Sequence, residues 1–199
     1  MLRASVRRVL FLAAVPGCGL LGPGAAPGKR GNAEAEEYAA YDSLIRAKFT
    51  VEGVDTMVVG ALTSTDPCDW EIARRTEQLQ REMPELGEST LEDFRSKNRI
   101  QYLLHPRMFR TRVKIVMLSE EQAEEMFRRR NGWQAFYTRY PGARGILRLS
   151  RVGFNRSRSQ ALVYAAFSED YLAGRGYYLL LTKTGGTWSV TRGMLAWIS

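Results

Sequence analysis

The chain has 199 residues, of which 45% are hydrophobic, so it is long enough to bury a substantial core in one domain. Its net charge is +8 at neutral pH, and its pI is about 9.8. Two cysteines and a single histidine exclude a disulfide-stapled fold, a multi-cysteine metal site and a histidine-rich metal cluster. The basic charge is compatible with a polyanionic partner, and equally with a solvated basic surface.

Residues 1–17 are predicted to be a signal peptide. A basic start, MLRASVRR, is followed by the apolar run VLFLAAV, which is much shorter than the roughly 20 residues that a transmembrane helix needs. The end of this segment, Pro16-Gly17-Cys18, resembles the lipobox of bacterial lipoprotein precursors, although Pro16 stands where Ala or Ser is usual. The resemblance implies that Cys18 is acylated and becomes the mature N-terminus. The alternative is an ordinary secretory signal with an incidental cysteine.

Residues 18–32 are expected to form a lipid-anchored flexible tether, because GLLGPGAAPGKRGN is rich in Gly, Pro and Ala. Gly19 follows the lipobox cysteine, and the lipoprotein resemblance then implies the outer membrane rather than the inner one. Residues 33–199 are expected to form a single α+β domain.

The first part of that domain alternates between predicted helices and strands. A helix beginning near Ala33 places Tyr38, Tyr41, Ile45 and Phe49 on one face. Residues 54–63 and 112–118 are short and rich in β-branched side chains, which favours strands. Further helix starts are predicted at Asp66-Pro67, at capping boxes pairing Ser89 with Glu92 and Ser119 with Gln122, and after Asn131-Gly132.

The last third of the chain, from Gly145 onward, contains four β-rich segments with short connections, which predicts an antiparallel meander. Gly185-Gly186 is expected to form the tight turn of its final hairpin. We therefore expect N-terminal helices packed on a C-terminal four-stranded antiparallel meander. The helix carrying Trp133, Phe136, Tyr137 and Tyr140 should cover one side of the sheet, with Trp188 buried.

Two resemblances are carried by this region. The stretches SRVGFN (150–155), QALVY (160–164), GYY (176–178) and the closing WIS (197–199) are similar to a bacterial secreted family to which no activity is attached. The order of helices and then strands also resembles cone-shaped α+β folds of the cystatin and nuclear-transport-factor kind. Such folds serve both enzymes and binding modules, so they imply an architecture and not a function.

Candidate chemistry is sparse. His105 precedes Pro106 at an expected helix end, and a catalytic role would need a nucleophile and an orienting carboxylate that no motif supplies. Cys68 is expected at a helix N-terminus, which favours a reactive thiolate, but Asp66 and Asp69 disfavour one. We therefore predict no catalytic residue, no metal site and no cofactor.

The best binding candidates in the sequence are arginines. Arg156 and Arg158 lie in an expected turn and could share a face that contacts a polyanion. Arg148 and Arg151 should point to opposite sides of their strand, so they cannot form one patch. Nucleic acid is not expected as a partner of an exported protein.

The sequence therefore predicts an exported, lipid-anchored envelope protein with a binding or structural role, attached to the membrane through its acyl chains. Its further partner, whether a protein, a glycan or a small molecule, is left open. The alternative is an envelope hydrolase that uses a pocket between the helices and the sheet.

Overall fold

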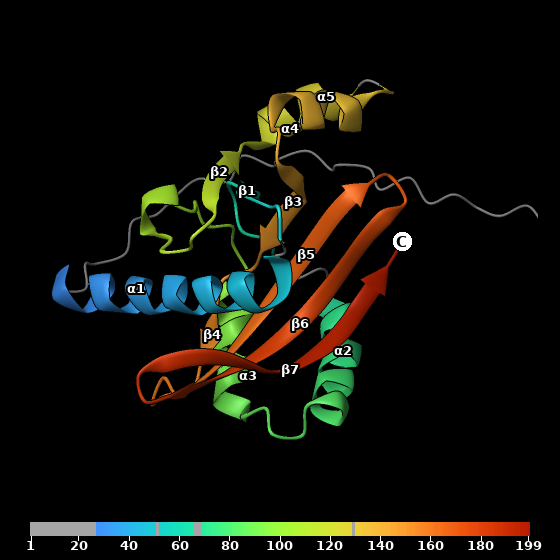
Figure 1. The fold of residues 1–199 in the computed structure, drawn as a ribbon. Coiled ribbons are helices and arrows are strands. Elements are labelled where there is room, and N and C mark those ends of the chain that lie inside the picture. Colours follow the sequence, from blue (N-terminus) through green and yellow to red (C-terminus); the bar gives the residue numbers. More distant parts are fainter. Residues whose placement is uncertain (1–26, 51, 66–68, 129) are drawn as a thin grey trace, which may run out of the picture.

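The computed structural model describes residues 27–50, 52–65, 69–128 and 130–199, except for the side chains at 27–32 and 69–74. This part of the chain forms five α-helices and a large, mostly antiparallel sheet of seven strands (Figure 1). The mixed helix-and-sheet class is confirmed. The sheet is larger than the expected four-stranded meander, because the strands predicted near 54–63 and 112–118 join the same sheet.

The helices begin with α1, which starts at Pro27, before the expected start near Ala33. They are α1 (Pro27–Leu44), its continuation as the π-helix η1 (Ile45–Phe49), α2 (Asp69–Glu82), α3 (Glu88–Lys97), the 3-10 helix η2 (Pro106–Met108), α4 (Glu120–Phe127) and α5 (Gly132–Arg139). Among the described residues, none of these helices combines the length and the apolar character needed to cross a membrane.

The strands are β1 (Thr56–Gly60), β2 (Lys114–Leu118), β3 (Ala143–Leu149), β4 (Gly153–Phe154), β5 (Gln160–Asp170), β6 (Ala173–Thr184) and β7 (Thr187–Ile198). Their order across the sheet is β2-β1-β3-β5-β6-β7, and β4 pairs with β5. β1 runs parallel to both β2 and β3, whereas the pairs from β3 to β7 are antiparallel. The long strands β5 and β6 therefore form the centre of the antiparallel part.

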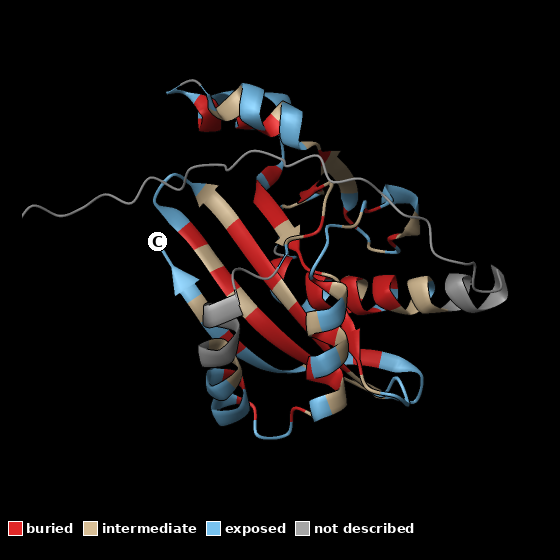
Figure 2. Ribbon diagram, turned by 180° about the vertical axis from the view of Figure 1, so that it is seen from behind, coloured by how far each residue is buried: buried red, intermediate tan, exposed pale blue. Residues whose placement is uncertain are grey.

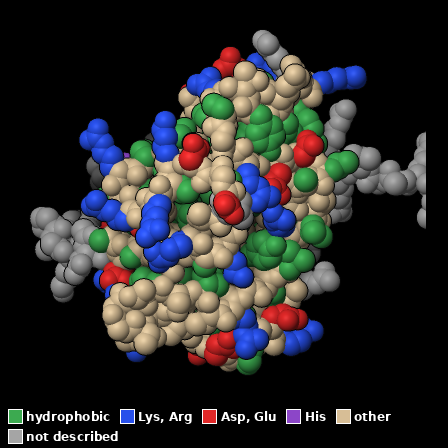
Figure 3. Space-filling model, viewed as in Figure 1, with side chains coloured by type: hydrophobic (Ala, Val, Ile, Leu, Met, Phe, Trp, Pro, Cys, Tyr) green, Lys and Arg blue, Asp and Glu red, His purple; other side chains and the backbone are tan. Residues whose placement is uncertain are grey.

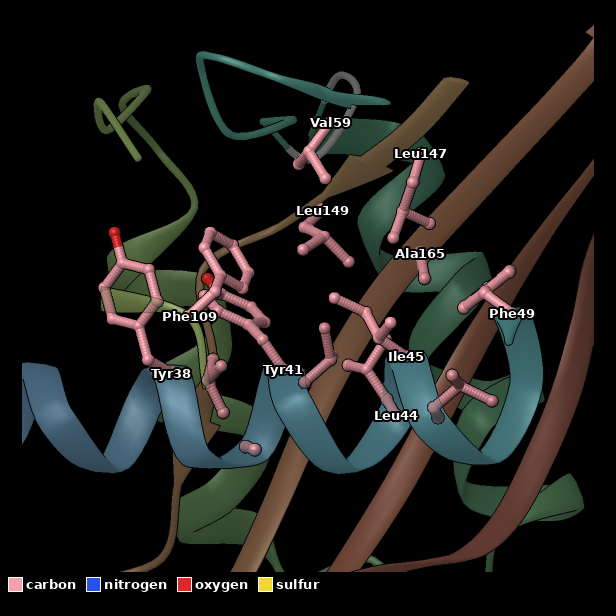
Figure 4. Close-up of a cluster of buried hydrophobic side chains, with 14 of the residues drawn as sticks. Tyr38, Tyr41, Leu44, Ile45, Phe49, Val59, Phe109, Leu147, Leu149 and Ala165 are labelled. Carbon is pink, nitrogen blue, oxygen red and sulfur yellow. The ribbon is translucent and has the colours of Figure 1, made fainter. Parts of the chain in front are cut away.

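One face of the sheet is covered by α1, which crosses the strands in Figure 1. The apolar side of this helix, predicted from its spacing, is buried against the sheet, as the close-up in Figure 4 shows. Its buried side chains are Tyr38, Tyr41, Leu44, Ile45 and Phe49. They meet side chains from β1, β3 and β5, including Val59, Leu147, Leu149 and Ala165. This is the largest core cluster of the described chain.

The opposite face is covered in two separate places (Figure 2). At one end, α2 and α3 pack on β5, β6 and β7 through Leu79, Phe94, Leu162 and Leu180. At the other end, α4 and α5 pack on β1 and β3 through the side chains of Ala123, Trp133, Phe136 and Ile146. Within the described part of the chain, neither of these two clusters extends over the middle of this face.

Helix starts follow local chemistry in one case and tertiary contacts in another. The Ser119 side chain accepts from the Gln122 amide, and the Gln122 side chain accepts from the Ser119 amide, so this predicted capping box is confirmed. The box predicted at Ser89 is wrong, because α3 already begins at Glu88 after Gly87. The Gln160 side-chain oxygen, from β5, accepts from the Gly87 amide at 2.8 Å and so replaces a local cap.

The final hairpin has the predicted turn. Gly185 and Gly186 have φ values of 58° and 82°, which glycine adopts without steric cost. Trp188, which follows the turn, is 4% exposed and belongs to the α1-side core. The buried position expected for Trp188 is therefore confirmed.

Candidate ligand-binding site

The middle of the sheet face opposite α1, which the described parts of the two helix clusters leave open, contains a block of small residues. Arg148 of β3 lies opposite Ala166 of β5, and Ala166 lies opposite Gly176 of β6. Gly176 in turn lies opposite Trp197 of β7, and opposed residues of antiparallel strands share a face. The small residues of this block are Ala166, Ser168, Gly174 and Gly176, with Ser168 paired to Gly174 in the next row.

Two groups of aromatic side chains flank this block. On the side of α2 and α3, the rings of Tyr164 and Tyr178 lie 5.1 Å apart. On the side of α4 and α5, Trp133 lies 5.0 Å from Phe127 and 6.4 Å from Tyr171, measured between ring centroids. The result is a hollow of about 880 Å³, which we call the trough, with small residues as its floor and aromatic rings as its walls.

The glycines of β6 are needed because Trp197 lies across them. A Cβ on Gly176 would collide with the Trp197 indole, and one on Gly174 would lie 3.0 Å from its six-membered ring. The Trp197 indole N–H donates to the Tyr164 hydroxyl at 2.6 Å, which holds the ring in this position. Trp197 is 37% exposed, so it forms part of the rim of the trough.

Arg148 is half-buried and lines the trough at its β3 side. Its side chain passes Gly60 of β1, where an added Cβ would lie 3.5 Å from the Arg148 Cγ and 3.9 Å from Nη1. Burial lowers the pKa of the Arg148 guanidinium, while attraction by Glu120 acts in the opposite direction. The trough therefore presents a guanidinium that is only partly hydrated.

Two further charged side chains reach the trough. The Arg75 guanidinium carbon lies 5.7 Å from the centre of the Tyr178 ring. Asp170 is exposed at the end of β5 and accepts from the Tyr171 amide at 2.7 Å. Among the described lining residues, no histidine and no cysteine is present. The described chain also contains no group of three or more His, Cys, Asp or Glu side chains able to hold a metal ion.

The residues singled out in the sequence lie away from the trough. His105 is exposed, is not among the lining residues, and precedes the 3-10 helix η2 instead of ending an α-helix. The helix end expected at His105 is therefore wrong. Cys18, Cys68 and Asp66 lie outside the described residues.

Arg156 and Arg158 are exposed in the turn between β4 and β5. Arg158 has a φ of 53°, and its amide donates to the Asn155 carbonyl at 3.0 Å, so the turn is well defined. The turn precedes the start of β5, whereas the trough is lined by β5 residues from Tyr164 onward. On the face shown in Figure 3, basic side chains lie interspersed with acidic and apolar ones. A polyanion contact at Arg156 and Arg158 stays a prediction.

Arg148 and Arg151 do point to opposite sides of the sheet. Arg151 forms an ion pair of 2.9 Å with the buried Glu37 of α1, and Glu37 also accepts from the Val152 amide. Asn98 of α3 accepts from the Arg151 amide at 2.7 Å. The SRVGFN stretch, which is distinctive in the sequence, therefore ties α1 and α3 to the sheet and serves a structural role.

Sequence reasoning missed the trough residues. None of the sequence motifs identifies Ala166, Ser168, Gly174 and Gly176 as parts of one site. The available signal was the alternation of small residues in two neighbouring strands, but the register that brings them together cannot be read from the chain. In comparisons, the chain matches no protein-family model, no curated protein and no solved structure.

Proposed function

We propose that this protein is an exported, lipid-anchored envelope protein that binds a small, largely apolar molecule in the trough. The observation that carries the proposal is the block of small residues at Ala166, Ser168, Gly174 and Gly176, enclosed by aromatic rings. Glycine in a strand often marks a site that another backbone approaches closely, but here the described residues leave a hollow of about 880 Å³. Ligand pockets are typically of roughly 300–1,000 Å³ and mostly apolar, with few polar groups.

The chemistry of the trough favours binding over hydrolysis. The Ser150 hydroxyl donates to the Arg151 carbonyl and accepts from the Tyr164 amide, so both of its roles are taken by the backbone. A hydrolase of the serine type needs a base beside its nucleophile, and His105, the one histidine of the chain, is not among the described lining residues. The alternative of an envelope hydrolase therefore gains no support from this site.

The location is proposed from the sequence. The basic and apolar start of the chain and the lipobox-like Pro16-Gly17-Cys18 support export and acylation at Cys18, with the outer membrane as the destination. Labelling cells with a palmitate analogue tests this. The wild-type chain should be labelled and Cys18→Ala should not; equal labelling of the two would refute the anchor.

A cone-shaped α+β architecture of the cystatin or nuclear-transport-factor kind is part of the proposal. It is supported by the helix α1 lying across one face of a sheet whose long strands are consecutive in the chain (Figure 1). In this chain, however, the trough opens on the face opposite α1, between the two other helix pairs.

Binding is tested with N-phenylnaphthylamine, a neutral apolar dye that fluoresces when it leaves water. We expect saturable binding to the wild-type protein. Ala166→Trp should fill the floor of the trough and weaken binding by tenfold or more, and Trp197→Ala should weaken it by removing part of the rim. The matched control is Ala39→Trp on the exposed side of α1, which should bind like the wild type. Equal dye binding by all four folded proteins would refute the proposal.

A further inference from the structure

The trough is not uniformly apolar, and its charges are unevenly placed. Arg148 lines it at β3, where its side chain passes over Gly60 of β1 and lies beside Ala166 of β5. Asp170 stands four residues further along β5 than Ala166, which corresponds to roughly 13 Å of extended strand. The trough therefore carries one half-buried cation at its β3 side, a second cation, Arg75, beside the Tyr178 ring, and an exposed anion, Asp170, at its rim.

A bound molecule would meet these charges in different surroundings. The Arg148 guanidinium is half-buried, so an anion beside it interacts through a medium of lower polarity than water. The planar guanidinium can also bind a carboxylate through two parallel hydrogen bonds. Asp170 is exposed and would repel the same anion, although solvent weakens that repulsion.

The aromatic walls of the trough supply the apolar surface of the site. Tyr164 and Tyr178 on one side, and Phe127 and Trp133 on the other, offer apolar surface to the body of a ligand. Burial lowers the pKa of Arg148, and attraction by Glu120 opposes that effect. A ligand anion would act on the guanidinium in the same direction as Glu120 and would favour its charged form.

From this arrangement we propose that the ligand of the trough is an apolar acid: a molecule with an apolar body between the aromatic walls and a single anionic group at Arg148. This inference rests on the proposed binding function and specifies its ligand class. It predicts one orientation, with the anionic group toward β3 and the apolar body extending along the floor formed by Ala166 and Gly176.

The test compares two dyes with the same phenylnaphthylamine skeleton, neutral N-phenylnaphthylamine and anilinonaphthalene sulfonate, whose sulfonate stands for the acid group. The wild-type protein should bind the sulfonate more tightly than the neutral dye. In Arg148→Gln, sulfonate affinity should fall by about tenfold or more, the size expected for a lost hydrogen-bonded charge pair. Neutral-dye affinity should change by less than about twofold.

Arg107→Gln is the matched control, because it removes an exposed arginine of η2 that is not among the residues lining the trough. It should leave both affinities unchanged. The inference is overturned if Arg148→Gln leaves the sulfonate affinity intact, or if Arg107→Gln lowers it equally. A third outcome separates this inference from the binding function. If Ala166→Trp abolishes binding of the neutral dye, but the wild-type protein shows no preference for the sulfonate, only the proposed ligand class is wrong. Failure of both dyes to bind would overturn the binding function itself.

Discussion

Replacing Trp188 by alanine should destabilise the protein more than most single substitutions. The indole lies between α1 and the sheet, is 4% exposed, and contacts Phe154 with ring centroids 5.6 Å apart. Its N–H donates to the Glu36 carboxylate of α1 at 2.9 Å. The substitution therefore removes buried apolar surface, leaves a cavity and deprives Glu36 of a donor.

Large-to-small changes of buried aromatic residues cost about 3 to 5 kcal/mol in unfolding free energy. The lost hydrogen bond does not add in full, because Glu36 is only half-buried and keeps its ion pair with Lys183 at 2.6 Å. We therefore expect Trp188→Ala to lose about 4 kcal/mol. Trp188→Phe keeps an aromatic ring in the core and should lose about half of that or less.

Chemical denaturation followed by far-ultraviolet circular dichroism measures both losses. Ser189→Ala is the control, because Ser189 is the next residue of β7 and is exposed. It should unfold within about 0.5 kcal/mol of the wild type. If Trp188→Ala and Ser189→Ala unfold at the same denaturant concentration, Trp188 is not in the core, and the packing of α1 on the sheet is wrong.

Three further predictions concern the contacts that hold the helices to the sheet. Glu37→Ala should lower the free energy of unfolding by about 3 to 5 kcal/mol, because it leaves Arg151 half-buried without its partner. The double variant Glu37→Leu, Arg151→Leu should recover much of that loss, as measured by denaturant melts. Gly153→Ala should lower the free energy of unfolding by about 1 to 3 kcal/mol, because its new Cβ would collide with the α3 backbone. Gly193→Ala, on the exposed edge of β7, should lower it by less. Equal losses in the two variants would contradict the close packing of α3 on Gly153. Burial raises the pKa of Glu36, but hydrogen bonds from Lys183 and Trp188 outweigh it and lower the pKa below the ordinary 4.5. The stabilisation by Glu36 should thus be complete above pH 4.5 and be lost as the pH falls through the folded-state pKa. The difference in unfolding free energy between wild type and Glu36→Gln should therefore become smaller in acid. A difference that stays constant with pH would contradict this.

Features set by neighbouring residues could be predicted from the sequence. The turn at Gly185-Gly186 and the capping box at Ser119 depend on contacts within five residues, and both are present. The apolar spacing of Tyr38, Tyr41 and Ile45 also identified the buried side of α1, because helical periodicity is a local property.

Features set by strand register could not be predicted. The block formed by Ala166 and Gly176 exists only because β5 and β6 pair in one register, and a shift by one residue would move these side chains to the α1 face. The parallel pairing of β1 with β2 joins residues more than 50 positions apart, with α2, α3 and the 3-10 helix η2 between them. The start of α3 depends on Gln160, a side chain from another element.

The most direct test of a binding trough is to see which residues a ligand touches. Amide NMR spectra recorded during titration with N-phenylnaphthylamine should show the largest shifts at Ala166, Gly174 and Gly176, and at the Trp197 indole N–H. The amides of Arg156 and Arg158, in the turn at the start of β5, should not move. Shifts confined to other surfaces, or no shifts at the floor of the trough at saturating dye, would contradict the account.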